Sequence, residues 1–180
     1  MKKSLWMRLA AVFAVLMLAI AMATPAQAVK SITVKSANWN YNRAPVARRA
    51  TKVTRGTYKV KIAGGKGYAK FTAPATKTYT FVVSGVKDTN RGSNGYWYIM
   101  TSQEYRKTLN YKYIGQTKVA TQGGKTTTMW MTVNGYKSSG TGTSKHLASR
   151  YAKIKLTKGE TVFVYFSFNN KGTTATLKIN

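Results

Sequence analysis

Apolar and polar residues alternate along much of the chain after residue 28, and the period of two is that of β-strands, not helices. The alternating stretches are rich in Thr, Tyr, Val, Phe and Ile, and Gly or Asn residues separate them. Asn134-Gly135 is the strongest tight-turn signal, because both residue types tolerate positive φ. The strands predicted in this way are 31–35, 57–62, 68–72, 77–84, 96–101, 111–119, 126–133, 151–157, 161–168 and 173–179.

Short strands at this spacing, about 8–10 in all, predict an all-β fold, an antiparallel sandwich or barrel. In residues 57–62 and 151–157 the apolar residues share one face, and the other carries Lys59, Lys61, Tyr151, Lys153 and Lys155. In residues 161–168 both faces are apolar, because Phe163 and Tyr165 alternate with Val and Phe. That strand is predicted either to be central and covered on both sides or to underlie an aromatic surface patch.

The first 28 residues have the pattern of a secretory signal peptide. Lys2, Lys3 and Arg8 form a positive start, residues 9–23 are an apolar run, and Ala26-Gln27-Ala28 is a small-x-small cleavage site. An uncleaved membrane anchor is the alternative, but the run is shorter than the roughly 20 residues that span a bilayer. We therefore expect a secreted protein, with residues 29–56 forming an N-terminal strand and a basic arm and residues 57–180 a β-sandwich domain. The chain has no cysteine, which excludes disulfides and thiolate metal sites.

Charge is the second strong signal. The chain carries 30 Lys and Arg residues against 3 acids, a formal net charge of +27. A surface this one-sided attracts polyanions. The outward-facing lysines predicted from alternation are Lys59, Lys61, Lys70, Lys153, Lys155 and Lys178, and they would form one basic face if their strands are neighbours. With the arm, the residues predicted to bind a polyanion are Arg43, Arg48, Arg49, Lys52, Arg55, Lys59, Lys61, Lys153 and Lys155.

Aromatic residues provide an alternative binding chemistry, because rings beside cations can stack on sugars or bases. The chain has 12 Tyr and 4 Trp residues. An exposed aromatic platform is predicted from Trp97, Trp130 and Tyr151, although core and cross-strand packing is the default use of such residues in strands.

The sequence contains few residues that could act as catalytic acids, bases or metal ligands. The acids are Asp88, Glu104 and Glu160, and the single histidine, His146, lies in the polar segment 138–150. A Ser–His–Asp arrangement would have to recruit Asp88, and a hydrolytic zinc site usually takes three protein ligands, which one histidine and no cysteine cannot supply. We therefore predict a protein that is not an enzyme, with no cofactor and no metal.

Two stretches resemble a known family. Residues 68–81 (YAKFTAPATKTYTF) are similar to the hairpin of bacterial pre-peptidase C-terminal-like domains, and residues 156–165 (LTKGETVFVY) with 174–179 (TATLKI) are similar to its closing hairpin and last strand. The resemblance implies a jelly-roll-like, non-catalytic β-sandwich of the kind appended to secreted hydrolases. The chain lacks the acids that relatives with Ca²⁺ sites would use, so no Ca²⁺ ligand is carried over.

The sequence thus predicts a secreted, monomeric binding protein that captures an anionic polymer outside the cell. The candidate partners are teichoic acid, acidic polysaccharide, nucleic acid or an anionic membrane surface, and retention on the cell wall is compatible with each. The first alternative is a module that binds neutral carbohydrate or peptide through its aromatics. A cationic toxin or bacteriocin, or an enzyme inhibitor, is the further alternative.

Overall fold

The structure is a computed structural model, and it describes residues 28–35, 49–89, 95–105, 108–113, 119–122, 128–136 and 140–180. Within these ranges the side chains of residues 101–105, 108–113 and 119 are not described. The predicted signal peptide, except its last residue, lies outside the described residues. No helix among the described residues is long and apolar enough to cross a membrane.

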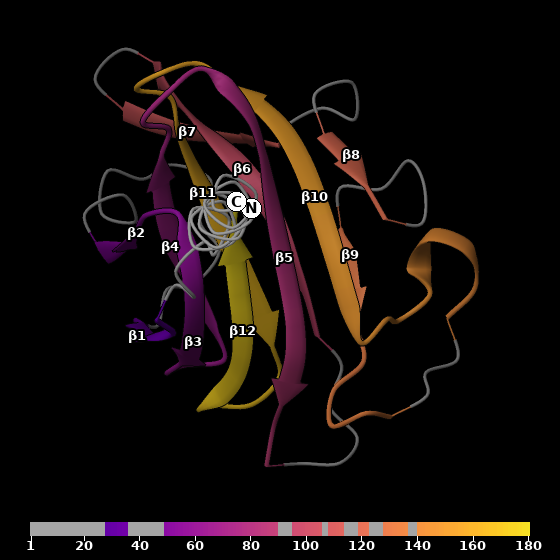
Figure 1. The fold of residues 1–180 in the computed structure, drawn as a ribbon. Helices are drawn as coiled ribbons and strands as arrows, with labels where there is room; N and C mark the ends of the chain where they lie inside the picture. Colours follow the sequence, from indigo (N-terminus) through magenta and orange to yellow (C-terminus); the bar gives the residue numbers. More distant parts are fainter. Residues whose placement is uncertain are drawn as a thin grey trace, which may run out of the picture.

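Two six-stranded sheets form the fold (Figure 1). Sheet A has the strand order β1-β3-β12-β5-β10-β8. Its strands are β1 (Lys30–Val34), β3 (Gly56–Ile62), β12 (Thr173–Ile179), β5 (Lys77–Lys87), β10 (Ser149–Leu156) and β8 (Val119–Thr121).

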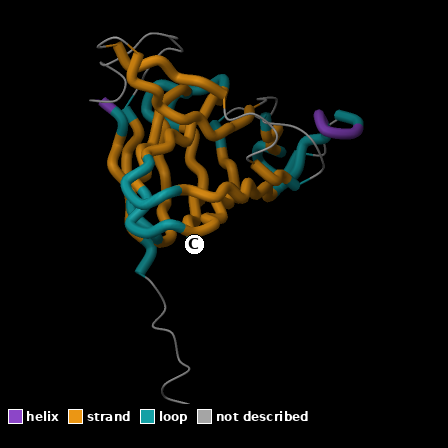
Figure 2. Tube along the Cα trace, turned by 90° about the horizontal axis from the view of Figure 1, so that it is seen from above, coloured by secondary structure: helices purple, strands orange, loops and turns teal. Residues whose placement is uncertain are grey.

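Sheet B has the order β2-β4-β11-β6-β7, and β9 also pairs with β6. Its strands are β2 (Thr51–Val53), β4 (Lys66–Thr72), β11 (Thr161–Phe168), β6 (Gly95–Tyr105), β7 (Thr108–Tyr113) and β9 (Met129–Met131). A single 3₁₀ turn among the described residues, η1 (Gly142–Ser144), projects from one side of the strands (Figure 2).

The hydrophobic core lies between the two sheets. Phe71 of β4 makes edge contacts with Tyr79 and Phe81 of β5, with ring centroids 5.0 and 5.5 Å apart, so these rings join sheet B to sheet A. The inward residues of β3 and β10 are the apolar ones that alternation predicts, among them Val60, Ile62, Ala152, Ile154 and Leu156, all buried. Their lysine neighbours therefore point to the outer face of sheet A.

The sandwich predicted from alternation is confirmed, and β11 is central and covered on both sides. Phe163 and Tyr165, on the face of β11 turned away from sheet A, are as buried as Val162 and Val164. The edges differ from a purely antiparallel sandwich, because β1 pairs with β3 and β2 with β4 in parallel. The described parts of the predicted N-terminal strand and arm thus belong to the two sheets.

Other differences concern strand bounds. The predicted strand 111–119 is wrong as a unit, because its two ends belong to β7 in sheet B and β8 in sheet A. Short β2 lies where the sequence predicted a basic arm. Asn134 and Gly135 form the predicted turn with φ of 53° and 71°, and the N–H of Tyr136 donates to the carbonyl of Val133 at 3.0 Å.

A β-bulge interrupts β5 near its end. Gly85 has a φ of +58°, a conformation that L side chains rarely adopt, and the register with β12 shifts between Thr174 and Thr176. The extra residue reverses the alternation: Val86 is buried, and the exposed Lys87 is paired with Thr174. The sequence prediction ended this strand at Ser84, just before the bulge.

Candidate functional site

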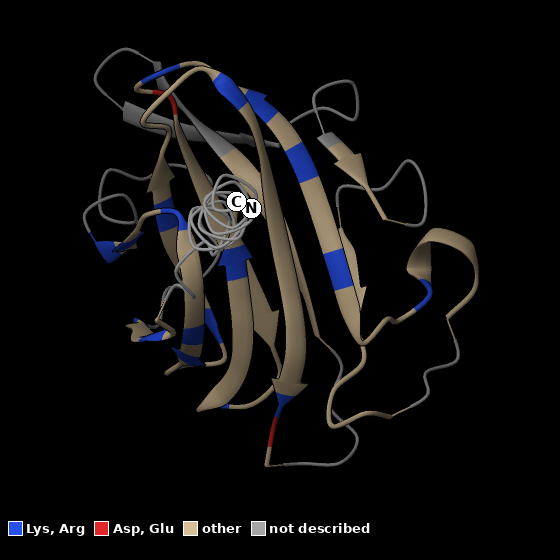
Figure 3. Ribbon diagram, viewed as in Figure 1, with Lys and Arg blue, Asp and Glu red and all other residues tan. Residues whose placement is uncertain are grey.

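The outer face of sheet A gathers exposed lysines from four strands, and we call it the lysine face. It comprises Lys59 and Lys61 of β3, Lys178 of β12, Lys87 of β5, and Lys153 and Lys155 of β10. These strands are consecutive neighbours in the order β3-β12-β5-β10. Figure 3 shows the basic positions along the front sheet, and the described residues of this face include no Asp or Glu.

Cross-strand register sets hydroxyl side chains beside these lysines. One row runs Thr33, Lys61, Thr174 and Lys87, and the next runs Ser31, Lys59, Thr176 and Ser84. Neighbouring strands lie about 4.8 Å apart and alternate residues of one strand about 6.6–6.8 Å apart, so the rows form a dense lattice of hydrogen-bond donors. Ammonium groups accept no hydrogen bonds, and hydroxyls can donate, so the lattice suits an acceptor-rich anion.

A hollow of about 520 Å³ lies over the β1 end of this face. The described residues that line it are Ser31, Ile32, Thr33, Lys59, Lys61, Gly172 and Thr174. Its polar side chains are thus two ammonium groups and three hydroxyls. A volume of this size is typical of small-ligand sites, which span about 300–1,000 Å³.

The structure brings together part of the residue set predicted to bind a polyanion. Lys59, Lys61, Lys153 and Lys155 lie on the lysine face, together with Lys178. Arg49 and Arg55 are exposed and flank β2 of sheet B. Arg43 and Arg48 lie outside the described residues.

Lys52 and Lys70 belong to the other sheet. They are opposite one another on β2 and β4, on the face of sheet B turned away from sheet A. Grouping Lys70 with the outward lysines of sheet A was therefore wrong, because alternation within a strand does not say which sheet the strand joins. Lys87 was not among the predicted outward lysines, because the bulge at Gly85 shifts the alternation of inward and outward residues in β5.

Trp97 does not belong to an aromatic platform, which corrects the sequence prediction. Its side chain is 0% exposed, because β6 turns Trp97 toward the core between the sheets and its neighbours Tyr96 and Tyr98 to the opposite face. The two remaining platform residues lie on different sheets. Tyr151 is half-buried on the lysine face, with the Nζ of Lys153 at 5.5 Å from its ring centroid.

Trp130 belongs to a row of rings on the outer face of sheet B. Its ring centroid lies 4.8 Å from Tyr96, and Tyr96 stacks on Tyr98 at 5.9 Å. The row continues through Tyr165 to Tyr68, at centroid distances of 4.9 and 4.7 Å. His146 stacks on Trp130 at 5.4 Å with an interplanar angle of 6°, so it covers one face of the indole that a sugar would need.

Arg150, the last residue of the polar segment 138–150, is a buried cation. It is 1% exposed and faces the interior from β10. Its guanidinium donates to the backbone carbonyls of Gln122 and Thr143, both at 3.2 Å, and to that of Lys145. Arg150 thus ties the η1 loop and the end of β8 to the sandwich. The signal was its place in the alternation of β10, where it occupies an inward position.

Burial, and after it the positive charge of Arg150, lower the pKa of His146 from its ordinary value of 6.5. We therefore expect the histidine to titrate with a midpoint below 6.5. A lowered pKa in the folded state means that the unfolded chain binds more protons below about pH 6.5. The contribution of His146 to stability should be constant above about pH 7.5 and should fall as the pH drops from there through its folded-state pKa.

Proton NMR can follow this titration directly, because His146 is the only histidine of the chain. A His146→Gln variant should lose the part of the acid destabilisation that begins below about pH 7.5 and ends below the folded-state pKa of the histidine. A midpoint at or above 6.5 would contradict the stacked, desolvated geometry.

The acids whose side chains are described have structural partners. The Asp88 carboxylate accepts hydrogen bonds from the side chains of Asn170 and Thr173, each at 2.8 Å, and so joins the end of β5 to the β11–β12 turn. Glu160 accepts the backbone N–H of Thr157 at 3.0 Å and closes the β10–β11 turn. Among the described residues, no group of three His, Cys, Asp or Glu side chains could hold a metal ion.

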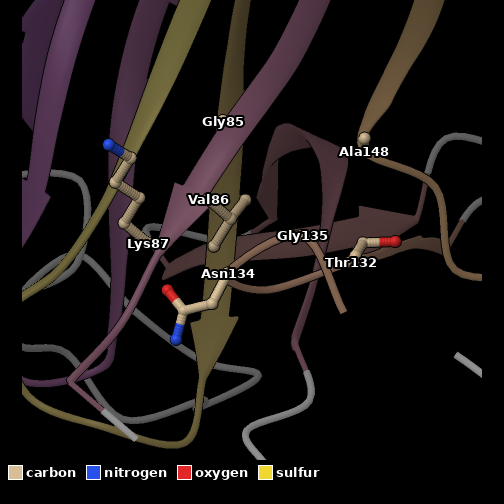
Figure 4. Close-up of a pocket in the computed structure, with 7 residues that line it drawn as sticks. All are labelled: Gly85, Val86, Lys87, Thr132, Asn134, Gly135 and Ala148. Carbon is tan, nitrogen blue, oxygen red and sulfur yellow. The ribbon is translucent and has the colours of Figure 1, made fainter. Parts of the chain in front are cut away.

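A second hollow, of about 360 Å³, lies beside the bulge and the Asn134-Gly135 turn (Figure 4). The Asn134 amide is already engaged, because it exchanges two hydrogen bonds of 2.8 Å with the backbone of Asp88. Lys87 also lines the hollow, but Figure 4 shows its side chain pointing away from Asn134 and Gly135. The polar groups of this hollow therefore serve the fold, and the lysine face remains the better candidate site.

Comparisons with known proteins leave the family open. No protein-family model matches the chain, and no curated protein matches it. A solved structure with a similar arrangement is that of CorA, described as a surface-associated copper-binding protein important in copper acquisition by Methylomicrobium album BG8. The match has a TM-score of 0.41 and 5% sequence identity, and it covers 73% of this chain and 98% of that chain.

Proposed function

We propose that the protein is a secreted, non-catalytic binding protein that captures an anionic extracellular polymer on its lysine face. The observation that carries the proposal is the set of exposed ammonium groups on neighbouring strands of sheet A, with hydroxyls between them and no acid on the described part of the face. Secretion rests on the predicted signal peptide.

Electrostatics favours this use of the face. Lysines held this close repel one another, and the described part of the face has no acid to offset the repulsion. A bound polyanion lowers this repulsive energy. Binding also releases the counterions condensed along the polymer, which makes the affinity strongly dependent on salt. A sheet places these charges on a rigid framework, so little backbone conformational entropy is lost on binding.

The test is the salt dependence of binding to an immobilised anionic polymer, with a neutral polymer as the control. Log affinity should fall linearly with log salt, with a slope of about −0.7 for each phosphate engaged by a flexible single chain. Affinities that are equal at about 50 mM and 500 mM salt would overturn the proposal. Binding to the neutral polymer alone would favour the alternative of a neutral-carbohydrate module, which the burial of Trp97 makes less suitable.

A further inference from the structure

We infer that the polymer is a poly(polyol phosphate), of the chemistry found in teichoic acids, and that the hollow at Lys59 and Lys61 anchors one of its phosphates. This inference rests on the proposed function and goes beyond it by naming the ligand class and the anchoring site. Three observations carry it: the donors of the hollow, the scarcity of rings on the lysine face, and the spacing of its lysines.

The hollow offers donors of two kinds in alternation. Lys61 lies between Thr33 and Thr174, and Lys59 lies beside Ser31 in the parallel pair of β1 and β3. Each ammonium group can meet a phosphate oxygen, and each hydroxyl can donate to or accept from a neighbouring hydroxyl of the ligand. A chain that alternates phosphates with free hydroxyls satisfies both kinds of group.

The described part of the lysine face offers few aromatic side chains on which the rings of a polymer could stack. Tyr151 is the aromatic side chain that the described residues contribute to the outer face of sheet A, and the ammonium of Lys153 already lies over its ring at 5.5 Å. Proteins that bind single-stranded nucleic acid stack successive bases on aromatic platforms, each stack contributing about 1–3 kcal/mol. Apart from Tyr151 and the exposed Tyr136, the rings among the described residues lie in the core or on sheet B, so on the described part of the lysine face a nucleic acid would gain mainly its phosphate contacts.

The spacing and type of the cations agree with a flexible phosphodiester. Lys59 and Lys61 are alternate residues of one strand, about 6.6–6.8 Å apart at the backbone, so their ammonium groups can reach neighbouring charges of one phosphodiester chain. The face carries lysines and, among its described residues, no arginine. Lysine meets a phosphate as a point charge, without the bidentate fork that arginine offers to phosphate and carboxylate alike.

The experiment measures affinity by calorimetry at fixed low salt for synthetic oligomers of equal charge. They are a glycerol-phosphate oligomer, an oligothymidylate and an oligomer of a hexuronic acid. We expect the glycerol-phosphate oligomer to bind about 10-fold more tightly than either of the others, the margin of one or two extra hydrogen bonds. Inorganic phosphate, titrated alone, should bind weakly and compete with it.

Two sets of variants locate the anchor. The double variant Lys59→Gln/Lys61→Gln should weaken glycerol-phosphate binding by about 10-fold or more and flatten the salt slope by about 1 for each lysine. Its matched control is Lys66→Gln/Lys158→Gln, which removes two exposed lysines of sheet B and the β10–β11 turn and should leave binding unchanged. Thr33→Val/Thr174→Val keeps shape and charge, and should weaken glycerol-phosphate binding about 5-fold.

The outcomes distinguish three claims: the ligand class, the anchoring site and the proposed function. Equal affinity for all three oligomers, or tighter binding of the oligothymidylate or the hexuronate, would overturn the inferred ligand class but leave the proposed function in place. An effect of the control pair as large as that of Lys59→Gln/Lys61→Gln would overturn the anchoring site. Absence of salt-dependent binding to every anionic oligomer would overturn the proposed function itself.

Discussion

Replacing Lys59, Lys61, Lys153 and Lys155 together by glutamine should weaken binding to an anionic polymer by about 100-fold or more at about 0.1 M salt. Each lysine near a polyanionic surface contributes on the order of 1 kcal/mol, and four such losses exceed the roughly 2.7 kcal/mol that a 100-fold change represents. The residues are exposed, and surface substitutions of this kind usually change stability by less than about 0.5 kcal/mol each.

A charge-matched variant distinguishes a specific face from general attraction. Lys52→Gln/Lys66→Gln/Lys145→Gln/Lys158→Gln removes the same charge from exposed positions on sheet B, the η1 loop and the β10–β11 turn. This variant should lose about 10-fold at most, through the reduced overall field. Equal losses in the two variants, measured by pulldown and calorimetry over a salt series, would show that net charge acts without a defined face.

Replacing Arg150 by methionine should cost about 3–5 kcal/mol of folding free energy, the largest effect we expect from a single substitution. Methionine fills similar space but donates nothing, so the carbonyls of Gln122, Thr143 and Lys145 lose a buried partner. For a chain of this size the melting temperature should drop by roughly 10 °C or more. Urea unfolding followed by tryptophan fluorescence measures the change.

Two further variants check the cause of that loss. Arg150→Lys keeps the charge but not the planar fork, so it should fall between the wild type and methionine. Arg55→Met, at an exposed arginine of the β2–β3 turn, should unfold within about 0.5 kcal/mol of the wild type. A methionine variant at position 150 as stable as the wild type would mean that the three carbonyls find other donors.

Local alternation was enough to predict the sandwich and the outward direction of several lysines. It succeeded for Lys59, Lys61, Lys153 and Lys155, because β3 and β10 keep strict alternation between lysines and buried apolar residues. It could not predict that β3 and β10 share a sheet, since strand order follows from pairing between residues far apart in the chain. Lys70 shows the limit: its strand joins sheet B, so it faces the other side of the molecule.

In strands with aromatic residues at successive positions, the sequence pattern does not show which face points into the core. In β6 either Trp97 or its tyrosine neighbours could have faced inward, because all three side chains are large and partly apolar. The structure buries Trp97 between the sheets and builds the ring row from the tyrosines. Only partner strands decide such a case, and β11, with apolar residues on both faces, supplies a packing surface for either choice.

The strand β1, at the edge of sheet A, begins two residues after the predicted cleavage site and also lines the hollow at Lys59 and Lys61. Val29, which is 64% exposed, directly precedes β1, and Ser31 and Thr33 of that strand line the hollow. Removal of the predicted signal peptide after Ala28 would create a new α-ammonium group at Val29. Such a group has a pKa of about 7.7–8.0, so processing itself would add a positive charge beside the hollow, and this charge would be partly neutralised in mildly alkaline surroundings.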